Sequence, residues 1–338
     1  MRTLLFTLLA AACSSAVFAA DPVPASDKPP GLPRALDYLV KTSNTWMEDH
    51  NCATCHHVTM TIWSLREAAS AGISYDTKTL AKTIEWVMSP PVNSTTFPEK
   101  REGDRARFSL PAGYLALALA GGDGVPEDWW AKLRNDALTY QKPDGSWELQ
   151  AGGRPPILTP VTENFTLVAA NALAADHTRK PDAKVSAALD KAVAWLSAHP
   201  ATEETQDHAM RLLLYSRLQR EPEAAKKSAA WLREHQKEDG GWPQTPGAPS
   251  DAHGTGQAVV ALSASGVPAG DPAIQRARAF LTKTQKPDGS WPMGSRPNGP
   301  GKGPASKLEP ITTTGTAWGA LALARTEPRK SAGGEAPQ

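Results

Sequence analysis

Cysteine and histidine side chains are concentrated in one short segment, NCATCHH, at residues 51–57. Cys52 and Cys55 are separated by two residues, and His56 follows directly. This C-x-x-C-H spacing is typical of c-type haem attachment, in which two thiols reach the two vinyl groups of one haem and the adjoining imidazole reaches the iron. We therefore expect Cys52, Cys55 and His56 to bind haem c, with His56 as the proximal iron ligand.

Two other uses of these side chains remain open. Cys52 and Cys55 could form a reversible disulfide, but a redox C-x-x-C is typical of a strand–helix unit and this chain is expected to be all-helical. They could instead hold zinc tetrahedrally with His56 or His57 and one distant histidine. Zinc is the stronger of these two alternatives.

The N-terminal sequence indicates export, which is the setting in which haem c is attached. Residues 1–20 combine Arg2, an apolar run and a small-residue end, as in a secretory signal peptide. A lipoprotein with lipid on Cys13 is a minor alternative. We expect a periplasmic or secreted protein, with a proline-rich linker at 21–33, one domain at 34–326 and a disordered tail at 327–338.

Charge and hydropathy exclude two classes of partner. Without the signal peptide, basic and acidic residues balance, so nucleic-acid binding is not expected. No later run of apolar residues has the length of a membrane span. A small apolar or isoprenoid-like ligand and a redox partner protein remain compatible with the sequence, which does not indicate an oligomeric state.

A repeated segment organises the remainder of the chain. QKPDGSW occurs at 141–147 and 285–291, and QKEDGGW occurs at 236–242. Before each copy lies an amphipathic helix, and after it lies a more apolar helix that must be buried. The sequence predicts six outer–inner helix pairs: 35–38 with 57–71, 79–88 with 110–120, 129–140 with 163–175, 185–198 with 206–217, 224–236 with 254–264, and 273–285 with 314–324.

Six such pairs predict an all-α fold, an (α/α)6 toroid in which six outer helices surround six inner ones. An open solenoid is the alternative, but it would need polar terminal faces that neither end of the chain provides. In the first pair, the segment VKTSNTW at 40–46 is interpreted as a degenerate copy of the repeated segment.

The polar residues that begin the inner helices are expected to surround one mouth of this ring. His253 and His208 are the preferred distal haem ligands, followed by His57 and Met210, whereas Met60 lies on the same helix face as His56. Asp251, His253, Asp207 and Glu163 are the candidates for acid–base catalysis. The full set expected at the mouth is Arg107, Thr162, Glu163, Asn164, Asp207, His208, Asp251, His253, Thr312 and Thr313.

The Q-x-x-x-D-G-x-W segments resemble the QW motif of squalene-hopene cyclases, within the superfamily of terpene cyclases and protein prenyltransferases. The resemblance extends over residues 35–326 and implies that Gln141, Trp147, Gln236, Trp242, Gln285 and Trp291 join successive outer helices. The C-x-x-C-H-H segment, DAxxTGQA at 251–258 and TGTAW at 314–318 also resemble a group of exported bacterial proteins related to squalene cyclases.

The chain departs from the cyclases and prenyltransferases at their reactive residues. Where squalene-hopene cyclases carry the acidic DxDDTA segment, this sequence has Asp251, then His253 and Gly254. A histidine near its ordinary pKa cannot protonate an alkene as a desolvated carboxylic acid can. The zinc-binding cysteine of prenyltransferases has no counterpart in the second half of the chain. Three functions follow: a haem c toroid for electron transfer or small-molecule oxidation, a haem-free scaffold, and a divergent cyclase or lyase.

Overall fold

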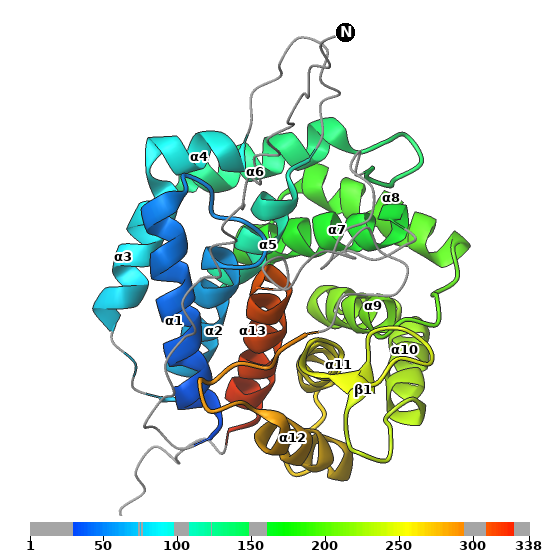
Figure 1. Cartoon of the computed structure of the whole chain (residues 1–338). Coiled ribbons are helices and arrows are strands. Elements are labelled where there is room, and N and C mark those ends of the chain that lie inside the picture. The colour runs from blue at the N-terminus through cyan, green and yellow to red at the C-terminus, as the bar shows by residue number, and fades with distance from the viewer. Residues whose placement is uncertain are drawn as a thin grey trace, which may run out of the picture.

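The computed structural model describes residues 30–73, 75, 77–97, 108–122, 124–148, 161–293 and 309–327. These residues form two concentric layers of helices (Figure 1). The inner layer comprises α2 (Val58–Ser70), α5 (Leu110–Leu119), α7 (Val161–Arg179), α9 (Thr205–Leu218), α11 (Ala252–Ala264) and α13 (Glu309–Thr326). The outer layer comprises α1 (Leu32–Asp49), α3 (Thr77–Met88), α6 (Glu127–Tyr140), α8 (Ala183–Ala198), α10 (Pro222–Glu234) and α12 (Pro272–Thr284).

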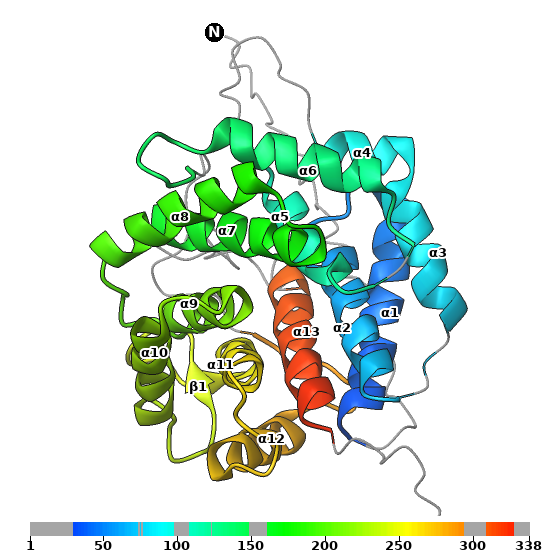
Figure 2. The ribbon, with the colours of Figure 1, turned by 180° about the vertical axis from the view of Figure 1, so that it is seen from behind.

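The inner helices form a closed ring, because each packs on the next and α13 packs on α2. The view from behind shows the same order, with the outer helices around it (Figure 2). Nearly every residue of α5, α9 and α11 is buried, as their apolar sequences predict. The predicted (α/α)6 toroid and its six helix pairs are confirmed, and an open solenoid is excluded.

The repeated segments join neighbouring outer helices, and in each copy the Gln Nε2 donates to a backbone carbonyl at the next outer helix. The Gln285 side chain binds both backbone groups of Gly31, donating from Nε2 to the carbonyl at 3.0 Å and accepting from the amide at 2.6 Å. The Trp291 indole donates to the Leu281 carbonyl at 2.9 Å. Gln141 and Gln236 bind α8 and α12 in the equivalent way. The last copy therefore closes the ring onto the start of α1.

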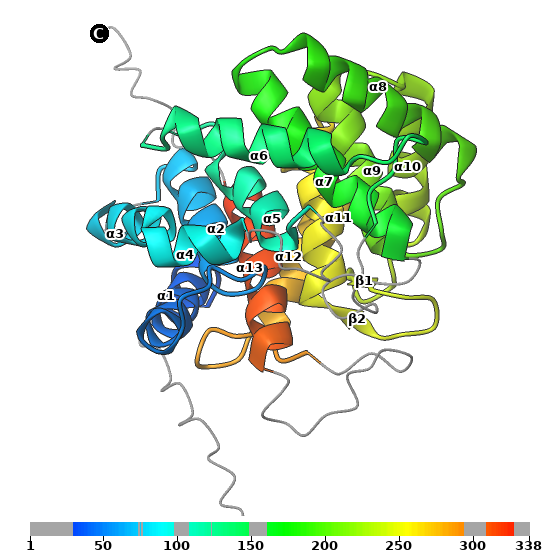
Figure 3. The ribbon, with the colours of Figure 1, turned by 90° about the horizontal axis from the view of Figure 1, so that it is seen from above.

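Three details differ from the sequence prediction. The helix predicted at 35–38 is the long α1, which contains the whole VKTSNTW segment, so the interpretation of that segment as a degenerate repeat turn is wrong. It lacks the Pro-Asp-Gly turn, so nothing interrupts the helix. A short helix, α4 (Pro90–Thr96), follows α3. Two short strands, β1 (Trp242–Pro243) and β2 (Ser250–Asp251), pair antiparallel beside α11 (Figure 3).

Candidate functional site

The C-x-x-C-H segment forms the loop between α1 and α2 and is held by a set of local hydrogen bonds. Thr54 adopts a left-handed conformation, with φ +51°, and its hydroxyl accepts from the backbone amides of His56 at 3.2 Å and His57 at 3.0 Å. The Trp46 indole at the end of α1 donates to the Cys52 carbonyl at 2.6 Å. The segment is therefore fixed in one conformation at the start of an inner helix.

A chain of three side chains orients the His56 imidazole. His57 Nε2 lies 2.6 Å from Glu309 Oε1 at the start of α13, and His57 Nδ1 lies 2.5 Å from His56 Nδ1. Because the carboxylate only accepts, we assign His57 the tautomer that carries its proton on Nε2. His57 Nδ1 then accepts a hydrogen bond from the Nδ1–H of His56. With this assignment Nε2 of His56 carries no proton, and its lone pair is available to bind a metal ion.

Burial sets the ionisation of this loop. Desolvation, and secondly the neighbouring His57, lower the pKa of His56 to about 3. His56 is therefore neutral at physiological pH, which is the form that binds a metal. Desolvation also raises the pKa of the Cys55 thiol to about 12. A thiol held protonated is a poor redox nucleophile, so this environment disfavours a thioredoxin-like use of the pair.

The donor set fits a covalently attached haem. Cys52 and Cys55 are free thiols, each partly exposed, so neither is consumed by a disulfide. A metal-binding histidine commonly donates its other ring N–H to a fixed acceptor, which is the arrangement at His56. Within the described ranges, no three His, Cys, Asp or Glu side chains are gathered as a site for a metal ion. Zinc binding would thus require these side chains to move together.

The two preferred distal ligands have different surroundings. His208 stacks on Trp231 of the outer helix α10, with ring centroids 4.0 Å apart, so it is turned toward the outer layer. Burial lowers the pKa of His208 to about 4. His253 is buried on α11 and lies edge-on to Trp318 of α13, with centroids 6.1 Å apart. His253 therefore lies between the inner helices α11 and α13.

The candidate acid–base residues are not gathered into one group. Asp251 caps α11 by accepting from the Gly254 amide at 2.8 Å, and it also accepts from Gln244. Asp207 forms a buried ion pair with Arg211 at 2.6 Å. Glu163 lies in the first turn of α7. Asp251 thus has a structural role as a helix cap, and Asp207 has one as the partner of Arg211.

The other residues predicted at the mouth have separate environments, and so do two methionines and three histidines that were not predicted there. Thr313 and Asn164 are buried, and Thr312 accepts from the Met293 amide at 3.3 Å. Thr162 is partly exposed, and Arg107 lies outside the described residues. Met60 and Met210 are buried in the core. His199 and His235 bind the carbonyls of Trp195 and Trp231, and His177 accepts from the Asp182 amide.

Sequence reasoning missed several polar groups on the inner helices. The side-chain amides of Gln206 on α9 and Gln257 on α11 are buried, and neither has a hydrogen-bond partner within the described part of the chain. The same is true of the Trp318 indole nitrogen on α13. Each buried polar group without a partner lowers the stability of the fold by about 1–3 kcal/mol unless a ligand or water forms a hydrogen bond with it. These groups are therefore candidates for contact with a bound water or polar ligand.

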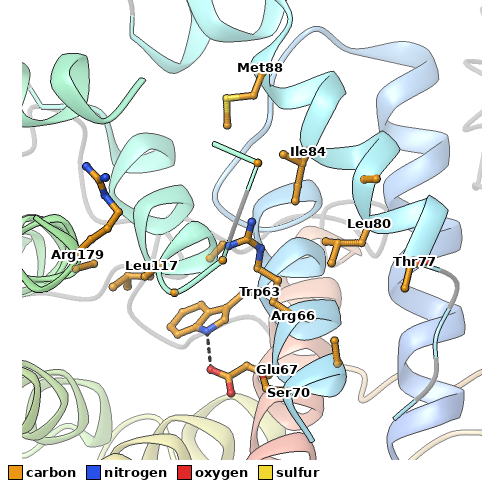
Figure 4. Close-up of a pocket in the computed structure, with 18 of the residues that line it drawn as sticks. Trp63, Arg66, Glu67, Ser70, Thr77, Leu80, Ile84, Met88, Leu117 and Arg179 are labelled. Carbon is orange, nitrogen blue, oxygen red and sulfur yellow. Dashed lines mark hydrogen bonds between the residues drawn. The ribbon is translucent and has the colours of Figure 1, made fainter. Parts of the chain in front are cut away.

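A large cavity lies at the opposite ends of the inner helices. Its volume is about 1360 Å³, and it opens between α2, α3 and α5 (Figure 4). Trp63, Leu80, Ile84, Met88 and Leu117 give it apolar walls. The sequence had indicated a ligand site at the other mouth, where the inner helices begin. The arginines of this second mouth were not singled out.

Comparison with known proteins bears out the fold. Residues 202–290 match the profile of the squalene-hopene cyclase N-terminal domain, which is about a quarter of the chain. The chain has the α/α toroid fold of the squalene cyclases. Among curated protein sequences, none matches it. Among the described residues, no helix combines the length and apolar character that a membrane span requires.

Several solved toroids resemble the chain at low identity. The ent-copalyl diphosphate synthase of Streptomyces platensis is 18% identical, with a TM-score of 0.50 over 80% of this chain. This chain spans only 50% of that one. The unsaturated glucuronyl hydrolase of Bacillus sp. GL1 is 14% identical, with a TM-score of 0.53 over 87% of this chain and 95% of its own. A type II terpene cyclase from Scytonema, solved with geranylgeranyl dihydroxybenzoate, is 13% identical, with a TM-score of 0.50 over 87% and 98%. Since both carbohydrate-active enzymes and terpene cyclases share this shape, the likeness establishes the fold alone.

Proposed function

We propose that this protein is an exported toroid that carries a covalently attached c-type haem and uses it for electron transfer or for oxidation of a small ligand. The observation that supports this most is the oriented His56 imidazole beside two free thiols. Cys52 and Cys55 would hold the porphyrin, and His56 Nε2 would bind the iron. Haem supplies one-electron redox chemistry that no side chain of this protein can perform.

The surrounding residues would tune and position that group. Glu309 accepts a hydrogen bond from His57 Nε2–H, which makes His57 Nδ1 a better acceptor for the His56 N–H and would make His56 a stronger ligand for iron. Trp46 and Thr54 hold the loop from which the thiols project. His253 would be the second side chain to bind the iron, because His208 is stacked on Trp231 of α10.

Export and the class of ligand are parts of the same proposal. The signal-like residues 1–20 support a periplasmic or secreted location, where haem c is attached. Among proteins of this fold, the Scytonema cyclase was solved with an isoprenoid-bearing substrate, which makes an isoprenoid-like ligand reasonable for the ring interior. Cyclase activity itself is disfavoured, because His253 stands where a cyclase needs its acid.

The haem assignment is tested by the visible spectrum of the full chain produced in cells that express c-type haem maturation proteins. We expect a Soret band, and a pyridine adduct spectrum typical of haem with two thioether bonds. His56→Ala should remove the iron ligand and change the spin state. His50→Ala is the matched control, because His50 also contacts Trp46 but is exposed.

Other outcomes would identify the alternatives. Protein without a Soret band that holds one zinc ion per chain would indicate the zinc-bound scaffold. Protein with neither group would indicate a haem-free scaffold or a divergent cyclase. Haem that is lost on extraction with acidified acetone would contradict the covalent attachment.

A further inference from the structure

The cavity at the second mouth exists because one outer helix stands away from its inner partner. α3 packs on α2 and α4, and the space between α3 and α5 is open. Leu80, Ile84 and Met88 lie on one face of α3, at intervals of four residues, and turn into this space while remaining only half-buried (Figure 4). Their spacing gives a continuous apolar wall opposite Leu117 and Trp63.

The inner end of the cavity carries excess positive charge. Arg325 is paired with Glu67 at 2.5 Å, and Arg179 is paired with Glu127 at 2.8 Å and with Asp176 at 3.0 Å. Arg66 also lines the cavity and donates to the Leu119 carbonyl at 2.6 Å.

Arg217 differs from Arg179 and Arg325, which are paired with carboxylates. Its guanidinium donates to the Asn171 carbonyl at 3.2 Å, and it has no ion pair with any residue that the structure describes. Burial, and secondly the charge of Arg325, lower the pKa of Arg217 to about 10. The side chain therefore remains charged at physiological pH, and the carboxylate whose charge acts on it, Glu67, is paired with Arg325.

We propose that this cavity binds a small amphiphilic anion, with its carboxylate or phosphate on Arg217 and its apolar chain along α3. A guanidinium offers several N–H donors in one plane, which suits either anion. An uncharged apolar ligand would leave that charge desolvated, whereas a highly charged polyanion would not match the apolar wall.

This site is separate from the haem loop. Arg66 follows His57 by nine residues along α2, which corresponds to about 14 Å at the helical rise. Arg217 lies on α9 and makes no hydrogen bond to the loop at residues 52–57. An experiment can therefore refute ligand binding at the cavity without refuting haem attachment, and the reverse.

Calorimetric titration of the full chain with dodecanoate, dodecyl phosphate and dodecanol tests the proposal. We expect one of the two anions to bind at least about tenfold more tightly than dodecanol, since a charge-assisted hydrogen bond is lost in the alcohol. The tighter anion identifies the head group. Equal binding of dodecanol would overturn the role of Arg217. Equal binding of inorganic phosphate and dodecyl phosphate would overturn the role of the apolar wall.

Two variants and a control locate the site. Arg217→Gln should weaken binding of the preferred anion at least about tenfold and leave dodecanol unaffected. Arg220→Gln is the matched control, because Arg220 lies just beyond the end of the same helix and pairs with Asp190 outside the cavity. Ile84→Gln, on the half-buried α3, should weaken both dodecyl anions without altering the circular dichroism spectrum. Unchanged affinity in both cavity variants would refute the site.

Discussion

Replacement of Gly289 by alanine tests how the ring is closed. Gly289 lies in the last repeated segment with φ +92°, and an added Cβ would collide with the Arg34 carbonyl oxygen on α1. The same segment carries the two hydrogen bonds between Gln285 and Gly31. The substitution should therefore separate the last repeated segment from the start of α1, where the outer layer of the ring closes.

The expected loss of stability can be divided into two parts. A non-glycine residue in the left-handed region costs about 1–2 kcal/mol. Displacement of α1 would weaken two hydrogen bonds, each worth about 0.5–1.5 kcal/mol. We expect Gly289→Ala to lower the free energy of unfolding by about 3 kcal/mol.

Gly247 provides the matched control. It has φ +77°, and a Cβ at this position would meet no atom within 4 Å. Gly247→Ala should therefore cost only the conformational part, about 1–2 kcal/mol. Urea denaturation followed by circular dichroism measures both values. Equal losses of stability in the two variants would refute the closure of the ring by this contact.

Three further predictions concern the ionisable groups of His208, Asp207 and Glu309. Because the pKa of His208 is lowered from its ordinary value of 6.5 to about 4, only the unfolded chain binds this proton between those values. The free energy of unfolding should fall by up to about 3 kcal/mol as pH drops from 6.5 to 4. Denaturation curves of His208→Gln should lack this loss. Those of His235→Gln, in which an exposed histidine is replaced, should retain it. Asp207→Asn leaves a buried arginine without its carboxylate and should cost about 3–5 kcal/mol, against less than about 1 kcal/mol for the exposed Asp190→Asn. Glu309→Gln should raise the haem reduction potential by roughly tens of millivolts in a spectroelectrochemical titration, since the axial histidine becomes a weaker donor; an unchanged potential would contradict the proposed histidine chain.

The repeated segments made the fold predictable. Gln, Asp-Gly and Trp recur at fixed offsets, and each has the same local role in every copy. The amide binds the next outer helix, and the indole binds the preceding one. The prediction was wrong in the first helix pair, where no such turn interrupts the chain. Trp46 in that pair lies at the end of α1 and binds the Cys52 carbonyl instead.

The local part of the candidate site was also accessible from sequence, but its distant contacts were not. C-x-x-C-H is visible within five residues. The partner of His57 is Glu309, 252 residues away, and only closure of the ring brings the two together. The arginines of the second mouth could have been found by aligning the ends of the inner helices, where Arg66, Arg217 and Arg325 occupy similar places. The pairing of Arg325 with Glu67, which distinguishes it from Arg217, depends on tertiary structure.

Covalent binding of haem to Cys52 and Cys55 is tested most directly by the intact mass of the exported protein after denaturation and extraction with acidified acetone. We predict a mass increased by one haem in the wild type and no such increase in the Cys52→Ala/Cys55→Ala double variant. A wild-type mass equal to that of the processed polypeptide, from cells whose maturation proteins load another c-type cytochrome, would contradict covalent attachment.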